Sequence, residues 1–255
     1  RPGAIKLKLS RYLDAPKLPT PPGEFGHEAL ISDWLMLKND VVCDCKVAES
    51  LHETMLWNAE ASRAVNIDDD CAIANYSAVT GYDPSQDVTG DDGSVSNPTD
   101  QGTDVAELAA YRLKTGLVDA DGHRHRVGAY VALTPGDLTE LWLAAYLFDG
   151  VGVGVQFPQQ WMDAFSNGQP WDALADPDVE GGHYVTGVAK RDGNLVVVSW
   201  GQTVQLTPAG YQQFCDEAVA YVSQEKLANG IDLEGLNWAQ LVADLQTLNT
   251  GGQLQ

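Results

Sequence analysis

The chain has 255 residues, 44% of them hydrophobic, which is enough to bury the core of one large domain or of two lobes. Its 36 acidic residues outnumber 15 basic ones, and the net charge of −21 argues against nucleic acid as a partner, because such a field repels phosphate backbones. The sequence contains no run of about 18 apolar residues, so no transmembrane helix and no membrane partner are expected.

The first 26 residues are rich in proline and in basic side chains, and they predict an extended arm that lies on a surface or on a partner. Arg1 to Leu9 lack the apolar stretch of a signal peptide, so we expect synthesis in a cytoplasm. After the arm, apolar residues recur with helical spacing in three stretches. These predicted helices cover about 47–58, 70–79 and 104–115, and a polar loop is predicted at 81–102.

From about residue 120 the pattern changes to short apolar runs that are typical of β-strands. The predicted strands lie at about 125–133, 151–157, 184–188, 195–200 and 204–206. The predicted helices of this half lie at about 137–148, 208–226 and 236–248. Together the elements predict an α+β fold with an arm at 1–26, a domain at 27–227 and a helical tail at 228–255. Within the domain, a helical lobe (27–120) precedes a β-rich lobe (121–227).

Two reactive side chains stand at junctions between these elements. Cys45 lies at the N-terminal edge of the first helix, where free backbone N–H groups and the helix dipole favour a thiolate. His183 follows two glycines and opens a predicted strand. If the lobes fold against each other, Cys45 and His183 meet across a cleft as nucleophile and base. Asn39, six residues before Cys45, is the candidate that would join the Cys45 backbone N–H in holding an oxyanion.

Several blocks of sequence resemble the papain-like cysteine peptidase superfamily, over about residues 35–222. In that family a Gln stands six residues before the nucleophilic Cys, as Asn39 does here, and the 138 residues between Cys45 and His183 fit the family's spacing. The other matching blocks are Asp100 to Asp104, Ala144 to Phe157, Glu180 to Val188, and Leu195 to Gly201. The resemblance implies a papain-like two-lobe fold with Cys45 and His183 as the catalytic pair. It also implies a cleft wall that contains Gly102, Gly182, Ser199 and Trp200.

Two positions depart from the family's pattern. The Asn that orients the histidine falls on Val198, which cannot hydrogen-bond an imidazole, and the aromatic residue after the nucleophile is replaced by Lys46. His183 would then be held by a backbone carbonyl, by Ser199, by water, or not at all. Loss of a base-orienting residue lowers the rate of such an enzyme without abolishing it. A working Cys–His dyad and a site that has lost its activity are therefore both open.

A narrower likeness rests on Asn39-Asp40 with Asp44-Cys45, and on the blocks 52–58, 99–104 and 216–221. These resemble papain-fold proteins that tailed phages of actinobacteria encode, and the resemblance implies a phage product that is incorporated in the virion. One hypothesis is a cysteine hydrolase that acts on a peptide or on a cell-wall amide. The other is a non-catalytic capsid decoration or minor tail protein whose N-terminal arm binds capsid or tail proteins. Neither hypothesis needs a cofactor.

The remaining cysteines and histidines give weaker patterns. The family's tether of the nucleophile helix implies a Cys43–Cys71 disulfide, whereas a cytoplasmic origin favours free thiols. Cys215 is expected inside the helix predicted at 208–226, as a small buried residue. His123 and His125 lie in a predicted solvated turn, where a metal site would need a carboxylate at the right distance. No metal site is expected there.

Overall fold

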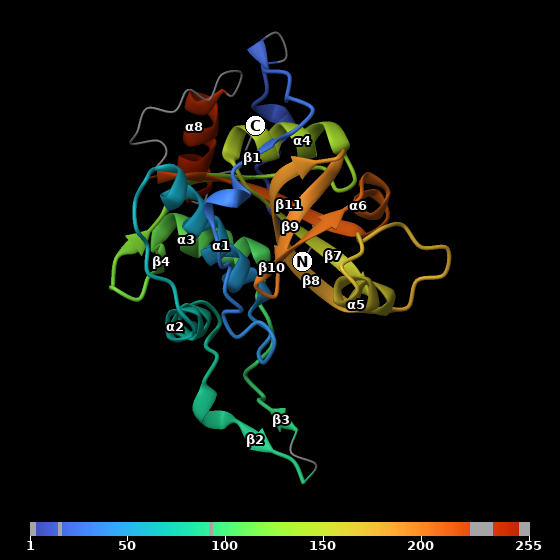
Figure 1. Ribbon diagram of the computed structural model, residues 1–255. Helices are drawn as coiled ribbons and strands as arrows, with labels where there is room; N and C mark the ends of the chain where they lie inside the picture. Colours follow the sequence, from blue (N-terminus) through green and yellow to red (C-terminus); the bar gives the residue numbers. More distant parts are fainter. Residues whose placement is uncertain (1–3, 15–16, 92–93, 225–236, 250–255) are drawn as a thin grey trace.

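The computed structural model describes residues 4–14, 17–91, 94–224 and 237–249 (Figure 1). The domain boundary expected at 227/228 and the last two residues of the helix expected at 208–226 lie outside the described residues, as do residues 1–3 and 15–16 of the arm and residues 228–236 and 250–255 of the tail. The chain forms a helical lobe from its first half and a sheet lobe from its second half, as the pattern of predicted elements indicates.

The sheet lobe contains a seven-stranded antiparallel sheet. Six strands follow one another in the order β10 (Gln202–Leu206), β9 (Asn194–Ser199), β8 (Val179–Arg191), β7 (Val151–Pro158), β11 (Cys215–Ser223) and β6 (Val127–Ala132). The short β1 (Phe25–Gly26) pairs with the far end of β8. Gly26 permits this pairing, because its φ is +116° and a Cβ there would overlap Ala189.

The helical lobe consists of α1 (Cys45–Glu60), α2 (Asp69–Thr80) and α3 (Val105–Lys114), which lie together on the left of Figure 1. Two small hairpins join it: β2 (Val88–Thr89) with β3 (Val95–Ser96), and β4 (Leu117–Val118) with β5 (Arg124–His125). Around the sheet lie α4 (Leu138–Phe148), α5 (Gln159–Ser166), α6 (Pro208–Phe214) and α8 (Trp238–Asn249).

Acidic side chains define where three of these helices begin. Asp68, Asp104 and Asp137 precede α2, α3 and α4, and each carboxylate accepts a hydrogen bond from a backbone N–H of the first turn. Such N-caps satisfy donors that have no partner within the helix. The Asp104 cap fixes the end of the loop from 100 to 103 in front of α3.

α1 differs from the other helices because every residue from Val47 to Asn58 is buried. It packs against α2 and α3 and against β8 of the sheet, so it connects the two lobes. A helix buried all round must pair its polar side chains internally. The acid Glu53 accordingly accepts a hydrogen bond from Arg112 of α3 at 2.6 Å, and Thr186 of β8 donates its backbone N–H to Glu49 at 3.2 Å.

The structure confirms the predicted helices at α1, α2, α3, α4 and α8 and contradicts the one at 208–226. Residues 208–214 are helical, as α6, but the following nine residues form β11. Cys215 is therefore the first residue of a strand and half-buried. Ala and Glu in 215–223 favour a helix locally, but the segment lies between β7 and β6, where pairing on both sides decides its state. α5 was not predicted, and the 81–102 loop contains the β2–β3 hairpin.

The N-terminal arm lies on the chain's own body. Ile5, Leu7 and Leu9 alternate into the core of the sheet lobe, and Ala132 donates its backbone N–H to the Leu7 carbonyl at 2.7 Å. Tyr12 continues this contact: its hydroxyl donates to Asp244 of α8 at 2.8 Å, and its carbonyl accepts from the backbone of Asn237 at 2.6 Å. The arm thus packs against both the sheet and the C-terminal helix.

All four cysteines are free thiols in the structure, so the disulfide implied for Cys43 and Cys71 is not formed. Cys71 instead completes the cap of α2, since its sulfhydryl donates to the Asp68 carbonyl at 3.2 Å. Among the helices of the described residues, none has the length and apolarity needed to cross a membrane.

Candidate active site

Cys45 is the first residue of α1 and lies against the middle of the sheet. Asp44 precedes it as the cap residue, and the Asp44 carbonyl accepts the first backbone hydrogen bonds of the helix from Val47 and Ala48. The backbone N–H of Tyr184 in β8 donates a hydrogen bond to the Cys45 sulfur. Tyr184 directly follows His183, so the predicted nucleophile and base come from adjoining positions of the two lobes.

The His183 ring is held on three sides. Its Nε2 is 2.8 Å from the Ser199 hydroxyl oxygen, and its face stacks on Trp200 with ring centroids 4.5 Å apart and an interplanar angle of 13°. The edge contact with Phe157 has a centroid distance of 5.4 Å. Because Ser199 engages Nε2, Nδ1 is the nitrogen left for Cys45 when Nε2 carries the hydrogen and donates to Ser199.

Ser199 therefore occupies the orienting role that Val198 cannot fill. Successive residues of β9 point to opposite faces, so Val198 packs into an apolar cluster with Trp34 and Leu56 while Ser199 faces His183. Trp200 lies at the turn after β9 with φ +46°, and its Nε1 donates to the Asn39 carbonyl at 3.2 Å. This bond fixes the indole that stacks on the imidazole.

Cys45 and His183 line one cavity of about 470 Å³ at the junction of the lobes, which we call the cleft. The other residues lining it come from the start of α1 and the residues before it, the 100–103 loop, β7, β8 and the start of β11: Cys43, Lys46, Asp100, Gln101, Gly102, Thr103, Gly154, Val155, Gly182, Asp216 and Glu217. Gly102 and Gly182, which the resemblance implied for the cleft wall, are among these lining residues. Ser199 and Trp200 lie behind His183 and contact it rather than lining the cleft.

Burial favours the uncharged form of both reactive groups, which contradicts the thiolate expected for Cys45 at the helix start. It raises the pKa of the Cys45 thiol to about 12, although the Tyr184 N–H and the Lys46 charge act in the opposite direction. Burial also lowers the pKa of His183 to about 4. A neutral thiol beside a neutral imidazole must transfer its proton as the sulfur attacks, so His183 would act as a general base.

The cleft carries excess negative charge. Asp100, Asp216 and Glu217 line it, and the cationic side chain lining it, Lys46, is bound to Glu217 at 3.0 Å and to the Thr103 carbonyl at 2.8 Å. Gly154 makes room for this arrangement, because a Cβ there would overlap the Glu217 side chain. A cleft of this charge favours a substrate that brings a positive group.

Asn39 does not line the cleft. It is 8% exposed, and among the described residues no group hydrogen-bonds its side-chain Nδ2. Its carbonyl holds Trp200, so its observed contact with the site is through the backbone. The sequence did not identify Tyr184, Phe157 or the acidic pair at the start of β11 as parts of the site. The alternation of β7 was a usable signal for Phe157, since Val155 pairs with His183 and Phe157 lies two residues further on the same face.

Within the described residues, two clusters could hold a metal ion, and both lie outside the cleft. One consists of His27, Glu60 and Asp149, and the other of Asp119, Asp121 and His123. In the second, Asp119 is engaged: one oxygen accepts backbone N–H groups of the turn, and the other lies 3.3 Å from His123 and 3.2 Å from His125. The second cluster therefore closes its turn with hydrogen bonds.

No family model matches the sequence, and no curated protein matches it. Solved structures do match the fold. Xylellain, a cysteine protease from Xylella fastidiosa, is 11% identical with a TM-score of 0.56, and the match covers 85% of this chain and 97% of that one. A cysteine protease of Carica candamarcensis, solved with E-64, is 10% identical over 79% of this chain and 98% of that chain, with a TM-score of 0.53. Procathepsin L 3 of Tenebrio molitor is 11% identical with a TM-score of 0.58, and the match covers 87% of this chain and 75% of that chain.

Proposed function

The chain has the papain-like α+β fold, and we propose that it is a cysteine hydrolase that cleaves amide bonds through Cys45 and His183. One observation carries the proposal: a helix-tip thiol and an imidazole line the same cleft, and the imidazole is held by Ser199 and Trp200. An imidazole stacked and hydrogen-bonded in this way presents one nitrogen in a fixed direction, as a general base requires.

In the proposed reaction, Nδ1 of His183 takes the thiol proton while the Cys45 sulfur attacks the amide carbon. The backbone N–H of Cys45, one of the first donors of α1, faces the oxygen that becomes negative. The C–N bond then breaks, and the imidazolium returns its proton to the leaving amine. Water hydrolyses the thioester with His183 again as base. Asn39 could add a second oxyanion donor only after its covered Nδ2 turns toward the cleft.

The lining of the cleft supports a substrate with a basic group near the scissile bond. Asp216 and Glu217 come from β11 and Asp100 from the loop before α3, and Lys46 neutralises part of that charge through Glu217. We propose that a Lys, an Arg or a cell-wall amine lies in this part of the cleft. Amide substrates that carry an acidic side chain there should react poorly, because like charges in a partly desolvated cleft repel.

Labelling with the epoxide E-64 or with iodoacetamide tests the proposal, with peptide mapping to locate the modified thiol. We expect Cys45 to react faster than Cys71, which is buried and hydrogen-bonded to Asp68. In the His183→Ala variant, labelling of Cys45 should slow by at least tenfold while labelling of Cys43 is unchanged. Equal rates at Cys45 and Cys71, or equal rates with and without His183, would refute an activated thiol.

The association with a phage particle is a separate proposal, and it rests on the sequence resemblance. We propose that the enzyme is made in the host cytoplasm and is carried in the virion. Because Ile5, Leu7 and Leu9 are buried in the chain's own core, capsid or tail proteins would contact the exposed side of the arm, where Lys6 and Arg11 lie. Mass spectrometry of purified particles tests this proposal. Absence of the protein from the particles would contradict it, whether or not the protein hydrolyses amides.

A further inference from the structure

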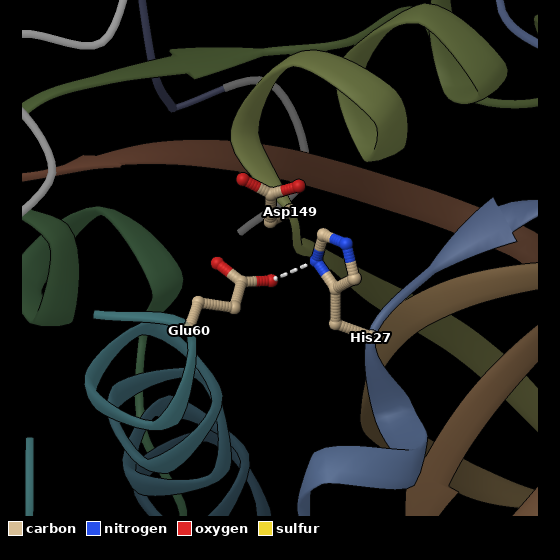
Figure 2. Close-up of side chains that lie close together, drawn as sticks. All are labelled: His27, Glu60 and Asp149. Carbon is tan, nitrogen blue, oxygen red and sulfur yellow. Dashed lines mark hydrogen bonds and ion pairs between the residues drawn. The ribbon is translucent and has the colours of Figure 1, made fainter. Parts of the chain in front are cut away.

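A second group of ligand-type side chains lies at the end of α1 opposite to Cys45. Figure 2 shows His27, which follows β1, Glu60, the last residue of α1, and Asp149, which follows α4. One ligand atom from each lies within 4.8 Å of the others, and His27 Nδ1 is 2.8 Å from Glu60 Oε1. With a rise of about 1.5 Å per residue along α1, the group lies roughly 20 Å from the cleft.

The backbone of each member is fixed by an ordered element. Arg191 of β8 donates to the carbonyls of Phe25 and Gly26 at 2.7 and 3.3 Å and to the Glu28 carboxylate at 2.8 Å, so the chain is held on both sides of His27. Glu60 is 10% exposed at the end of a buried helix. Asp149 ends α4 in the left-handed conformation, with φ 53°. Ligands carried by such rigid elements keep their geometry without the ion.

The chemistry of the three groups favours a divalent cation. Two carboxylates so close together repel each other, and a cation between them removes that repulsion. Metal–ligand bonds of about 2.1 Å place neighbouring ligand atoms roughly 3 Å apart, which the His27–Glu60 distance already meets. One imidazole nitrogen with carboxylate oxygens suits Zn²⁺ or Mn²⁺, whereas Ca²⁺ prefers six or more oxygen ligands.

We propose that His27, Glu60 and Asp149 bind one Zn²⁺ or Mn²⁺ ion that ties the segment after β1 to the ends of α1 and α4. The ion would join the helical lobe to the sheet lobe at the end of the interface remote from the cleft. Its role is stabilisation of the lobe arrangement, and its binding is independent of hydrolysis at Cys45.

Thermal unfolding and calorimetric titration of the full chain, freed of metal with a chelator, test this site. At about a hundredfold excess over Kd, Zn²⁺ or Mn²⁺ should raise Tm by roughly 5–10 °C, with one ion bound per chain. His27→Ala should weaken binding at least tenfold and remove that rise. Its side chain is 58% exposed, so the variant is expected to fold. Glu60→Gln should act in the same direction.

Two matched control variants distinguish ion binding at this site from ion binding by other side chains of the protein. His123→Ala removes another exposed histidine beside carboxylates, and Cys45→Ser removes the cleft thiol; both should respond to the ions as the wild type does. No rise in Tm with either ion would overturn the proposal and leave His27 and Glu60 as a plain ion pair. A rise that survives His27→Ala, or an equal rise with Ca²⁺, would overturn it as well.

Discussion

The Ser199 hydroxyl fixes the orientation of the His183 ring, in place of the asparagine whose position the sequence resemblance puts at Val198. The hydroxyl lies 2.8 Å from Nε2 and is fully buried, so no water competes for it. A serine hydroxyl is a weaker partner for an imidazolium than a carboxylate or an amide oxygen is. The dyad therefore depends on the stacked Trp200 as much as on this hydrogen bond.

We predict that Ser199→Ala lowers kcat about 10- to 100-fold with little change in KM, because the imidazole loses its fixed direction while the cleft is unchanged. Ser199→Thr keeps the hydroxyl and should recover most of the rate. The assay is amide hydrolysis of a peptide with a basic side chain, and thermal unfolding shows that both variants fold. An unchanged kcat in Ser199→Ala would show that the hydroxyl does not position the base.

Asp44 is a buried acid whose raised pKa should make the stability of the protein depend on pH. It is fully buried, and burial together with the nearby charges of Asp100 and Glu49 raises its pKa to about 8. In the unfolded chain an Asp titrates near 3.9. The folded chain therefore keeps a proton that the unfolded chain has lost between about pH 4 and pH 8. Its contribution to stability is complete below pH 4 and is lost as the pH rises to 8.

Asp44→Asn removes this titration, so the variant should gain stability over the wild type as the pH rises. The two should be similar near pH 4.5, and the variant should be more stable by a few kcal/mol at pH 8.5, since one pKa unit corresponds to about 1.4 kcal/mol. Urea unfolding at pH 4.5, 6.5 and 8.5 measures the difference. A difference that is constant with pH would mean that Asp44 is ionised in the folded chain.

Cys45 was predictable because it begins α1, and His183 because it lies in an apolar strand after two glycines, whereas their supporting partners were not. The helix start expected at Cys45 is confirmed, but His183 does not open its strand, because β8 begins four residues earlier at Val179 and pairs with β7 there. The choice between Ser199 and other partners of His183 depends on which face of β9 contacts the imidazole, and the unbroken apolar run of Leu195 to Val198 does not reveal that. Asn39 was misplaced for a similar reason, since positive φ at Leu37 and Lys38 turns the chain locally.

At the scale of elements, α1 is joined to the rest of the molecule by a buried ion pair. Arg112 of α3 donates to Glu53 at 2.6 Å and to the Ser50 hydroxyl at 3.2 Å, and its guanidinium lies 4.0 Å from the centroid of the Tyr221 ring in β11. Arg112 and Glu53 are each 1% exposed. The Arg112 side chain thus connects α1, α3 and β11.

Arg112→Met should destabilise the protein by about 3–5 kcal/mol, because it leaves Glu53 buried without its cation. The double variant Glu53→Gln/Arg112→Met should regain a large part of that loss, since neither position then holds a charge. Denaturant unfolding of the wild type, both single variants and the double variant gives the coupling energy. A loss under about 1 kcal/mol in Arg112→Met would show that Glu53 takes up a proton at little cost.

Element prediction failed where tertiary pairing outweighed local preference. The 208–226 segment begins as a helix with Thr207 as its cap, and its later Ala and Glu residues continue a helical signal. Those residues form β11 because they pair with β7 on one side and with β6 on the other. These partners lie about 60 and 90 residues earlier in the sequence, so a local pattern does not reveal the pairing. In the arm the local pattern agreed with the structure, since Ile5, Leu7 and Leu9 alternate in the sequence and are buried. What the sequence did not show is the surface that buries them, which is the edge of the sheet at β6.

At the scale of the whole molecule, the net charge of −21 acts on stability through repulsion between acidic groups on the surface. The Debye length falls from about 30 Å at 0.01 M salt to about 10 Å at 0.1 M, so salt screens the long-range part of this repulsion. The unfolded chain is more expanded and its charges are further apart, which means that screening favours the folded state.

We therefore predict that Tm rises by several °C when NaCl increases from 10 to 200 mM at pH 7. A chelator should be present throughout, so that binding of divalent ions at His27, Glu60 and Asp149 does not contribute. KCl should give the same rise as NaCl, because screening depends on ionic strength and not on the identity of the cation. A Tm that is unchanged or falls would mean that the surface ion pairs, which salt weakens, outweigh the repulsion. Lys38 with Asp69 at 3.3 Å and Arg191 with Glu28 at 2.8 Å are such pairs, and each contributes about 1 kcal/mol or less.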